Sequence, residues 1–448
     1  MATSTSNSTP ITDVDPSATG AGRYLVRGQK WGGELGLGVT LDFSFPAGEV
    51  SFATPYGIYS DAGEWRGVQS LGQGEQSAAR SALQAWSAVS GLCFNEVADN
   101  AQTAGEIRFA STTIDSGQEY AHAYFPNTDA SAGDVWLSAY NWNLGHNASI
   151  ARGSDDYQTL LHEMGHAVGL KHSFEGAYAM PAAHDNYFFT LMSYSARHAG
   201  DDGWASFYPT TPMYDDLVAI QALYGRNMDH NSGDTAYVFN DGTRYFETID
   251  DAGGHDRIVY TGRLNSTIDL NCGRFSTLSA PISFHNSSDT RATVAIGPST
   301  VIEDATGGRA RDTIFGNSAD NRLIGGAGDD ALYGGAGHDI LIGGAGHDTF
   351  YFNTALTKSN VDQIAGFQHG ADTIRLSHSV FDHLGRGALN IQAFATGHDA
   401  HNAGDRIVYD RAKGALYFDA DGSGHGDQME FASVRPGTFL TASDIVIY

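Results

Sequence analysis

The feature that most constrains the fold of this 448-residue chain is a nine-residue repeat that fills residues 307–351. Its five units have the sequences GGRARDTIF, GNSADNRLI, GGAGDDALY, GGAGHDILI and GGAGHDTFY. They follow the template G-G-x-G-x-D-x-U-x, in which U is apolar, and this template is typical of a parallel β-roll. A flexible Gly/Asp linker is the alternative, but a linker gives no reason for an apolar residue in every unit. We expect these eighth residues to lie on short strands and to point into the roll: Ile314, Leu323, Leu332, Leu341 and Phe350.

The composition of the repeat predicts several structural calcium ions as its ligands. Glycines permit turns that point backbone carbonyls inward, and aspartates add carboxylate oxygens, the hard ligands that calcium prefers. Consecutive units are expected on opposite sides of the roll, so each calcium should be shared by units n and n+2. The second unit has Asn321 in place of aspartate, so a calcium that uses this unit should bind most weakly. The predicted ligands in the repeat are Gly308, Asp312, Gly326, Gly328, Asp330, Gly335, Gly337, Asp339, Gly344, Gly346 and Asp348.

A second motif, H-E-x-x-H-x-x-G-x-x-H, begins at His162. His162 and His166 are four residues apart, so on a helix both imidazoles leave the same face and can bind one metal. Glu163 places a carboxylate where it can take a proton from water, and Gly169 permits a turn that brings up His172. Three protein ligands with one open position are typical of a catalytic zinc rather than a structural one. A coincidental polar helix face is the alternative, and the third histidine in register argues against it.

Composition narrows the classes of partner and compartment. The chain has 52 acidic and 25 basic residues and a formal charge of −27, which disfavours nucleic acid and anionic membranes as partners and suits calcium. No apolar run approaches the length of a membrane span. Residues 1–20 are polar, carry no N-terminal export signal, and are expected to be a disordered tail or short propeptide. Cys93 and Cys272 are expected to be free and buried, with a disulfide as the alternative.

The pattern of apolar residues predicts two structural regions. Residues 21–230 mix strands and helices, as an α+β protease domain would, with the metal on a helix. Residues 231–448 are rich in Gly, Asp, Thr and alternating apolar residues, which indicates an all-β calcium-binding domain. The expected helices cover 75–91, 156–169 and 214–224, and the expected strands are Val39–Phe45, Cys93–Val97, Ile107–Ala110, Ala121–Tyr124 and Asp134–Leu137.

Twenty residues after His172 comes the segment Leu191-Met192-Ser193-Tyr194. The long histidine motif followed by such a methionine resembles the metzincin proteases, and within them the serralysin branch of secreted bacterial zinc proteases. The resemblance implies that Met192 forms a turn beneath the zinc ligands. It also implies that the Tyr194 phenol binds zinc at rest and moves to the oxyanion in the transition state. Ordinary core packing of Met192 and a buried structural role for Tyr194 are the alternatives.

The serralysin resemblance covers nearly all of residues 30–448 and implies further calcium sites at the domain junction. A plain acidic turn at residues 251–256 is the alternative. After the repeats, Asp362 and Asp372 are kept, but Gly366 and Arg375 stand where the family has aspartate, which puts calcium there in doubt. The run 419–424 is expected to be a β-turn rather than a calcium loop. The implied junction ligands are Asn231, Gly233, Thr235, Asp251, Gly253, Asp256 and Glu303.

The last residues, 443–448, resemble the C-terminal address of type I (ABC transporter) secretion, and they could equally form the last strand. The sequence therefore predicts a monomeric, secreted, zinc-dependent endopeptidase that acts on proteins and peptides. The substrate is expected to add as an antiparallel strand to the edge strand 121–124. The alternative is a non-enzymatic calcium-binding adhesin or surface protein, which would have no need of the histidine motif. A secreted lipase is disfavoured because no G-x-S-x-G motif is found.

Overall fold

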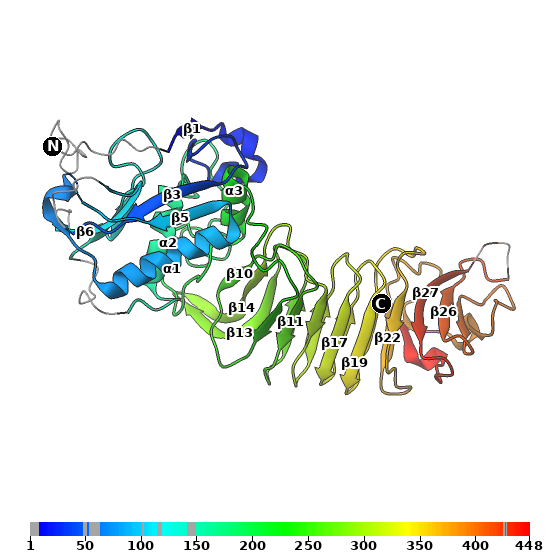
Figure 1. Ribbon diagram of the computed structural model, residues 1–448. Coiled ribbons are helices and arrows are strands. Elements are labelled where there is room, and N and C mark those ends of the chain that lie inside the picture. The colour runs from blue at the N-terminus through cyan, green and yellow to red at the C-terminus, as the bar shows by residue number, and fades with distance from the viewer. Residues whose placement is uncertain are drawn as a thin grey trace. The chain divides into compact units, whose positions relative to one another are not determined.

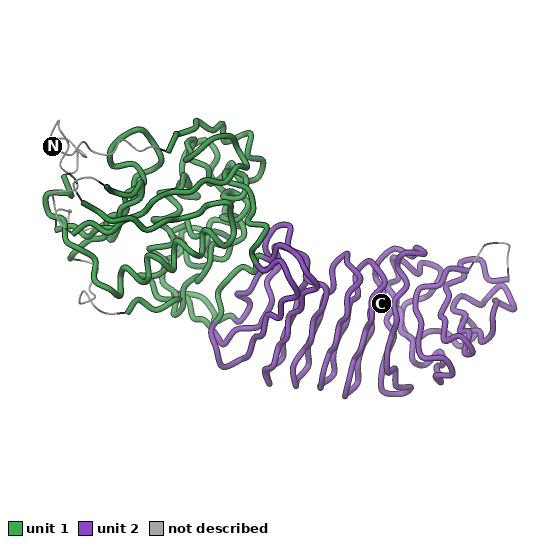
Figure 2. Tube along the Cα trace, in the orientation of Figure 1, with its two compact units in different colours: residues 1–230, 245–250, 282–290 green, residues 231–244, 251–281, 291–448 purple. Residues whose placement is uncertain are grey.

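The computed structural model describes residues 9–47, 52, 63–100, 103–113, 119–140, 149–423, 426 and 428–448 (Figure 1). Figure 2 colours two compact units separately. Unit 1 comprises Met1–His230, Tyr245–Asp250 and Ile282–Thr290, and unit 2 comprises Asn231–Arg244, Asp251–Pro281 and Arg291–Tyr448. A single boundary near residue 231, as the sequence predicts, would assign two short segments of unit 1 to unit 2. These segments join it because Phe246, Ile282 and Phe284 are buried in its hydrophobic core.

Unit 1 contains a mixed sheet with the strand order β5-β3-β6-β8-β7. Strands β5, β3, β6 and β8 pair in parallel, whereas β7 pairs antiparallel with β8 and forms one edge of the sheet. The edge position of β7 agrees with the strand expected to receive substrate. The strands are β3 (Val39–Ser44), β5 (Leu92–Glu96), β6 (Ile107–Thr112), β7 (Ala121–Ala123) and β8 (Val135–Ser138), and β4 (Val68–Gln69) pairs with β6.

Three α-helices complete unit 1: α1 (Gln73–Val89), α2 (Asp155–Ala167) and α3 (Tyr214–Tyr224). All three expected helices are confirmed to within about two residues at each end. Ser154 caps the N-terminus of α2: its hydroxyl oxygen accepts a hydrogen bond from the N–H of Tyr157. Helix α1 packs on α2, and the indole of Trp86 donates to the carbonyl of Leu161 at 3.0 Å. This buried contact fixes the helix that carries the histidine motif.

The expectation of a disordered tail over residues 1–20 is wrong for its described part. Residues 1–8 lie outside the described residues, but Ile11–Asp13 forms β1, which pairs antiparallel with β2 (Gln29–Trp31). A 3-10 helix, η1 (Pro16–Tyr24), follows β1, and a second one, η3, covers Glu64–Gly67. The segment is ordered because its backbone pairs with a distant strand, and its polar composition gives no signal of such pairing.

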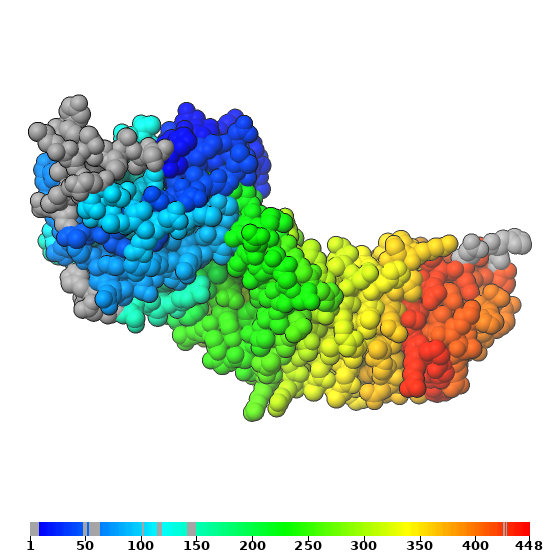
Figure 3. Space-filling view, in the orientation of Figure 1, coloured from blue at the N-terminus to red at the C-terminus, as the bar shows by residue number. Residues whose placement is uncertain are grey.

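Unit 2 is a roll of two sheets built from alternating strands. One sheet has the order β24-β25-β26-β27-β21-β19-β17-β15-β11-β9, and the other has the order β12-β16-β18-β20-β22-β28-β23. Figure 1 shows β17 and β19 side by side, with β11 further along the same sheet, and Figure 3 shows the chain from green to yellow as successive bands of the surface. Successive repeats therefore fall on opposite sheets, as expected.

The strands of the first sheet are β9 (Ala236–Phe239), β11 (Arg257–Tyr260), β15 (Asp304–Thr306), β17 (Arg322–Ala327), β19 (Ile340–Ala345), β21 (Asp362–Ile364), β24 (Phe394–Thr396), β25 (Ile407–Asp410), β26 (Ala415–Phe418) and β27 (Met429–Val434). Those of the second are β12 (Ser266–Asp269), β16 (Asp312–Phe315), β18 (Ala331–Tyr333), β20 (Thr349–Phe352), β22 (Thr373–Leu376), β23 (Gly387–Ala388) and β28 (Ile445–Ile447). The remaining elements are β10 (Glu247–Ile249), β13 (Phe275–Phe284), β14 (Ser287–Ile296), η4 (Ile391–Ala393) and η5 (Ala442–Asp444).

The apolar eighth residues of the repeats form the core of the roll. Ile314 pairs in register with Leu332 on the next strand of its sheet, and Leu332 pairs with Phe350. On the other sheet Leu323 pairs with Leu341. All five side chains have 0% relative exposure, which confirms the strand assignment and removes the linker alternative. Burying each contributes on the order of 1.5–3 kcal/mol.

The two cysteines are free, as expected, but both are exposed rather than buried. Cys93 lies on β5, which is an edge strand of the unit 1 sheet, and Cys272 lies in the turn after β12. The expectation of burial is wrong because position, not residue type, decides the exposure: Cys93 lies on a half-exposed edge strand and Cys272 in a turn. In the described part of the chain, no helix is long and apolar enough to cross a membrane.

Candidate active site

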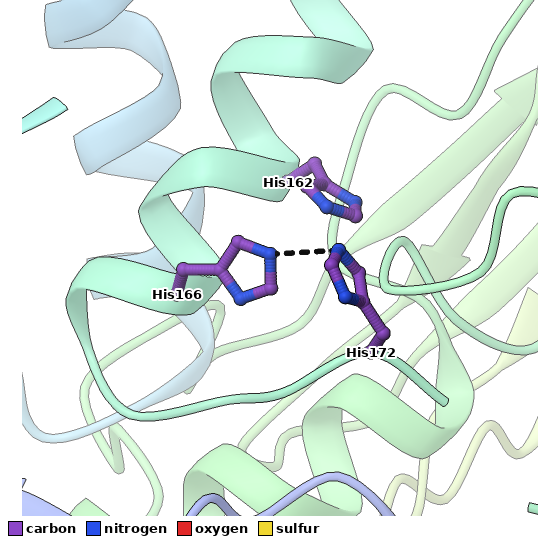
Figure 4. Close-up of side chains that lie close together, drawn as sticks. All are labelled: His162, His166 and His172. Atoms are coloured by element: carbon purple, nitrogen blue, oxygen red, sulfur yellow. Dashed lines mark hydrogen bonds between the residues drawn. The ribbon is translucent and has the colours of Figure 1, made fainter. Parts of the chain in front are cut away.

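Three histidine side chains converge in unit 1 (Figure 4). His162 and His166 project from one face of α2, and His172 arrives from the segment that follows the helix. One ring nitrogen from each lies within 4.8 Å of the others, and the Nε2 atoms of His166 and His172 are 3.1 Å apart. Among the described residues, this is the only group of three or more His, Cys, Asp or Glu side chains gathered this closely.

Gly169 produces the turn that brings His172 to the group. Helix α2 ends at Ala167, and Gly169 has φ +105°, a conformation that other residues rarely adopt. A β-carbon at this position would lie 2.6 Å from the carbonyl oxygen of Gln29. Backbone conformation and close packing therefore both require glycine here, as the motif predicts.

The far nitrogen of each imidazole is held by an oxygen atom. Nδ1 of His162 lies 2.7 Å from the carbonyl oxygen of Leu191, and Nδ1 of His166 lies 2.7 Å from that of Leu170. Nδ1 of His172 lies 2.7 Å from the Glu175 carboxylate. Because these oxygens can only accept, each Nδ1 carries the proton, and each Nε2 presents its lone pair to the centre.

Burial keeps the two helical histidines neutral. It lowers the pKa of His162 to about 4, and it lowers the pKa of His166 well below its ordinary value, with the neighbouring imidazoles adding to the effect. A metal ligand must be a neutral imidazole, so these two side chains are ready to bind a cation at neutral pH without losing a proton.

Glu163 follows His162 on α2 and lines the same cavity as His162, with 5% of its surface exposed. Its Oε2 atom is buried and has no hydrogen-bond partner among the described residues. Burial raises the pKa of this carboxyl to about 8, and the negative charge of Glu119 adds to the rise. A nearby divalent cation would oppose both effects and favour the carboxylate. The position suits a group that exchanges protons with a water molecule.

Met192 is fully buried beneath α2, in the turn that the resemblance implies. The turn is held by Asp216 of α3, whose carboxylate accepts from the hydroxyl of Thr190 at 2.6 Å and from the N–H of Leu191 at 2.8 Å. Because the Leu191 carbonyl in turn receives Nδ1 of His162, this buried carboxylate acts on the orientation of the histidine. In the sequence Asp216 stands near the start of a helix with no visible connection to the motif, because only folding brings the two together.

The hydroxyl of Tyr194 lies 2.7 Å from Nε2 of His172, so it faces the histidine centre. The side chain is 56% exposed, which does not fit a buried structural tyrosine. Partial burial raises the pKa of its phenol to about 12, with the Glu163 charge as the next cause. The phenol therefore stays protonated at neutral pH and can donate a hydrogen bond to an oxygen held at the centre.

A cavity of about 380 Å³ opens beside this group. Glu119, Tyr120 and Ala121, at the start of β7, form one wall. Asp155, Gln158 and Thr159 of α2 form another, and Tyr187, Ser193 and Tyr194 close the remaining side. His162 and Glu163 reach the same space. The cavity thus joins the edge strand to the histidine centre. Its lining residues Glu119, Asp155 and Tyr187 belong to no motif of the sequence.

Comparisons with known proteins agree with this geometry. Residues 69–190, which include the histidine motif, match the matrixin peptidase family, and residues 303–332 and 315–350 match the RTX calcium-binding nonapeptide repeat. Serralysin C of Dickeya chrysanthemi is 36% identical over 386 residues, which cover 80% of this chain and 76% of that protein. Metallopeptidase AprA of Pseudomonas marginalis is 32% identical over 455 residues, 94% of this chain and 89% of that protein.

The chain belongs to the serralysin family. Serralysin A of Dickeya chrysanthemi, which is 37% identical over 80% of this chain, supports the same family assignment. Membership confirms the resemblance, and with it the metzincin domain followed by a β-rich RTX region. The chain is a zinc metalloendopeptidase with calcium-binding repeats, and the non-enzymatic adhesin is not favoured.

The repeat aspartates of the chain form ladders inside the roll. Oδ1 of Asp330 accepts from the backbone N–H of Asp312 at 2.8 Å, and Oδ1 of Asp348 accepts from that of Asp330 at 3.0 Å. The second oxygens of Asp330 and Asp348 are buried without a hydrogen-bond partner in the described part of the chain. Such oxygens need a cation or a proton. Asp372 continues this ladder by accepting from the N–H of Asp348 at 3.1 Å.

On the opposite sheet Asp339 accepts from the N–H of Asn321 at 2.8 Å, and Asp362 accepts from that of Asp339 at 3.2 Å. Asp362 and Asp372 thus occupy ladder positions, although the sequence left calcium there in doubt. The side-chain amide of Asn321, in the second repeat, donates a hydrogen bond to the carbonyl of Glu303. This repeat therefore has a neutral hydrogen-bonding group where the other repeats have a charged carboxylate. The predicted repeat glycines at 326, 328, 335, 337, 344 and 346 all have positive φ, whereas Gly308 does not have one.

The junction residues implied by the family also gather within unit 2. Asp256 accepts from the N–H of Thr235 at 2.7 Å and donates its own N–H to Glu303 at 2.7 Å. Asp251 accepts from the N–H of Gly253 at 2.9 Å, and Tyr237 donates to it at 2.6 Å while receiving the amide of Asn231. The carbonyl of Gly233 accepts from the hydroxyl of Thr235 at 2.8 Å. Burial raises the pKa of Asp256 to about 6, with the charges of Asp251 and Glu303 contributing.

Proposed function

We propose that His162, His166 and His172 hold one zinc ion and that the chain hydrolyses internal peptide bonds of extracellular proteins. The observation that carries the proposal is the convergence of the three imidazoles beside the buried, unpartnered oxygen of Glu163. The donor set fits the metal. Neutral imidazoles with protonated Nδ1 atoms are typical zinc ligands, and three of them leave the fourth position open for chemistry.

The chemistry that zinc supplies when bound is Lewis-acid catalysis, which acidifies a water and polarises the scissile carbonyl. Glu163 then acts as the general base. Its free oxygen accepts the proton of the attacking water, and the same oxygen delivers that proton to the leaving amine nitrogen as the C–N bond breaks. Burial raises the proton affinity of the Glu163 carboxyl and a bound cation lowers it, so the two effects together suit a group that accepts and then releases a proton at neutral pH.

Tyr194 is proposed to stabilise the oxyanion. Its phenol lies at the edge of the histidine centre and remains protonated, so it can donate a hydrogen bond to the carbonyl oxygen as negative charge develops there. The side chain is largely exposed, which leaves it room to move between its position beside His172 and the substrate. Met192 takes no part in proton transfer and supports the helix from below.

The substrate backbone is proposed to add to β7. This strand lies at the sheet edge and its first residue, Ala121, lines the cavity beside Glu163. An extended peptide can pair antiparallel with such an edge and place its scissile bond over the histidine centre. Main-chain pairing explains how an endopeptidase can accept many sequences, because it reads no side chain.

Calcium is proposed to stabilise unit 2 at several sites along the two aspartate ladders and at the junction cluster of Asp251, Asp256 and Glu303. The proposed domains are a protease domain over 21–230 and a calcium-binding domain over 231–448. In calcium-poor cytosol the repeated carboxylates repel one another, so the roll should stay unfolded for passage through a type I secretion channel. Extracellular calcium then drives folding by binding only the folded form. We propose that the released enzyme is a monomer.

Metal analysis combined with casein digestion tests the function. The purified chain, held in excess calcium, should contain about one equivalent of zinc and should digest casein. Treatment with 1,10-phenanthroline, which removes zinc and leaves calcium, should abolish digestion, and added zinc should restore it. A His166→Ala variant should lose both zinc and activity. Digestion that survives the loss of zinc would contradict the proposal.

A further inference from the structure

We propose that the cavity beside Glu163 binds a lysine or arginine side chain, and that this side chain belongs to the substrate residue that follows the scissile bond. The inference rests on the proposed function, because it needs a substrate strand paired with β7. It adds a preference in side-chain charge to an enzyme whose main-chain recognition is indifferent to sequence.

The position of the cavity along β7 identifies which substrate residue it receives. The C-terminal side of this strand leads to Phe125, whose ring lies 5.2 Å from that of His166. The N-terminal side, Tyr120 and Ala121, lines the cavity together with Glu163. A substrate strand antiparallel to β7 runs from the Phe125 end towards the Ala121 end. Residues after the scissile bond therefore reach the cavity, and residues before it lie on the His166 side.

The charges around the cavity select a cation. Glu119 and Asp155 line it, and neither lysine nor arginine is among the described residues that do so. The Glu119 carboxylate is 53% exposed, and a third carboxylate, Asp156, accepts from the hydroxyl of the lining residue Tyr120 at 2.5 Å. Two groups oppose a cation: the positive end of the α2 dipole, and His122, whose Nδ1 lies 3.4 Å from the Glu119 carboxylate. Asp155 and Asp156 occupy the first turn of α2 and offset that dipole.

The depth of the cavity favours a long side chain. Asp155 precedes His162 by two helical turns, roughly 10 Å along the axis of α2. A short side chain therefore cannot bring a positive charge close to the Asp155 carboxylate. The long aliphatic stem of lysine or arginine can extend along the cavity and place its charge nearer to that carboxylate. The rings of Tyr187 and Tyr194 line the path and provide apolar surface for that stem and aromatic faces for the charge. A volume of about 380 Å³ accommodates such a side chain.

Peptides that differ at one residue test the preference. Internally quenched peptides of a single sequence carry lysine, arginine, norleucine or glutamate after the scissile bond, and mass spectrometry verifies the bond cleaved. With the zinc- and calcium-loaded full chain, kcat/KM for lysine and arginine should exceed that for norleucine by roughly 10-fold, the combined effect of two partly solvated carboxylates. Glutamate should be cleaved most slowly, and 1 M salt should reduce the differences.

Charge-removing variants identify the residues responsible. Glu119→Gln and Asp155→Asn should each reduce the ratio of lysine to norleucine cleavage about threefold, and the double variant should bring it to about 1. Asp155→Lys should reverse the order of lysine and glutamate, a change that damage to the fold would not produce. Asp229→Asn, at an exposed position that does not line the cavity, should leave the ratio unchanged.

Two outcomes would overturn the inference while the proposed function stands. One is a wild-type enzyme that cleaves the norleucine peptide as fast as the lysine peptide, and the other is a double variant that keeps the lysine preference. If the wild type cleaved neither casein nor any of the peptides, the proposed function would fail and the inference would fail with it.

Discussion

The Sδ atom of Met192 lies directly against the backbone of Gly165, in the space where a larger residue would place its side chain: a β-carbon on Gly165 would be 2.5 Å from this sulfur. Gly165 is an unspecified position of the histidine motif, between the two helical ligands. The contact packs the turn that contains Met192 against α2. The distance of His162 and His166 from this turn therefore depends on the contact.

Gly165→Ala should therefore destabilise the zinc centre. Overpacking a buried contact of this kind costs about 1–3 kcal/mol, although alanine favours helix by roughly 1 kcal/mol. We expect a lower melting temperature and weaker zinc retention, measured by thermal unfolding and by competition with a zinc chelator. Gly33→Ala is the matched control, because nothing lies within 4 Å of a β-carbon there. A Gly165→Ala protein as stable as wild type would show that the contact does not constrain the site.

Glu163→Gln separates proton transfer from metal binding. The substitution preserves the shape of the side chain and all three imidazoles, so zinc content should remain near one equivalent. Peptidase activity should fall by at least about 10²–10⁴, the range attributed to loss of a general base. Casein or peptide turnover close to wild type in this variant would remove Glu163 from the mechanism.

The parts of the structure that the sequence predicts well are those in which short-range pattern decides the geometry. His162, His166 and His172 follow from helical spacing and one glycine turn, and the roll follows from a repeat whose apolar position recurs every nine residues. In both cases the residues that interact are spaced by a fixed number along the chain. The sequence pattern therefore indicates directly which residues will be in contact.

The parts that it does not predict depend on contacts between distant segments. Strand β1 is ordered by pairing with β2, and Asp216 orients His162 only through the Leu191 turn. The charged lining of the cavity combines Glu119 of the segment before β7 with Asp155 of α2. No periodicity connects these positions, and a single aspartate at a helix start is most simply explained as a favourable charge near the helix N-terminus. Such roles become visible only after the chain has folded.

Tyr194→Phe examines the oxyanion role. If the phenol donates mainly in the transition state, kcat should fall by roughly 10²-fold, a typical cost of losing one such donor, while KM changes little. Zinc content is the control, because His172 keeps its Glu175 contact in the variant. A change confined to KM would assign Tyr194 to substrate binding in the ground state instead.

Calcium binding by the ladder that contains Asp330 and Asp348 can be tested with two Asp→Asn variants, each of which keeps the shape of the side chain and removes its charge. Asp330→Asn keeps the acceptor for the N–H of Asp312 but removes the charge, so the calcium needed to fold the roll should rise several-fold. Asp329→Asn is the control, because Asp329 is an exposed neighbour whose carboxylate pairs with Arg311. The readout is the circular dichroism of the full chain during a calcium titration. Equal midpoints for the two variants would indicate that the charge of Asp330 does not bind calcium.

The same carboxylates predict how the calcium-free roll responds to pH. Burial raises the pKa of Asp339 to about 6, of Asp330 to about 7 and of Asp362 to about 8, whereas an unfolded aspartate has a pKa of about 3.9. A pKa raised in the folded state means that the fold favours the protonated form. The stability contributed by these groups is complete below about pH 4 and is lost as the pH rises through 6, 7 and 8.

With calcium and zinc both removed by chelators, the chain should therefore retain more β-structure at about pH 5 than at about pH 8. At low pH protons occupy the carboxylates that would bind calcium, so calcium must displace them, and the further stability that it adds to the roll should be smaller at about pH 5 than at about pH 8. Asp362→Asn, which is neutral at every pH, should flatten the upper part of the profile. Urea unfolding followed by circular dichroism at several pH values measures this directly. A chelated roll that became more stable as the pH rose would mean that its carboxylates are stabilised as anions by the protein itself, which leaves calcium no electrostatic role in folding.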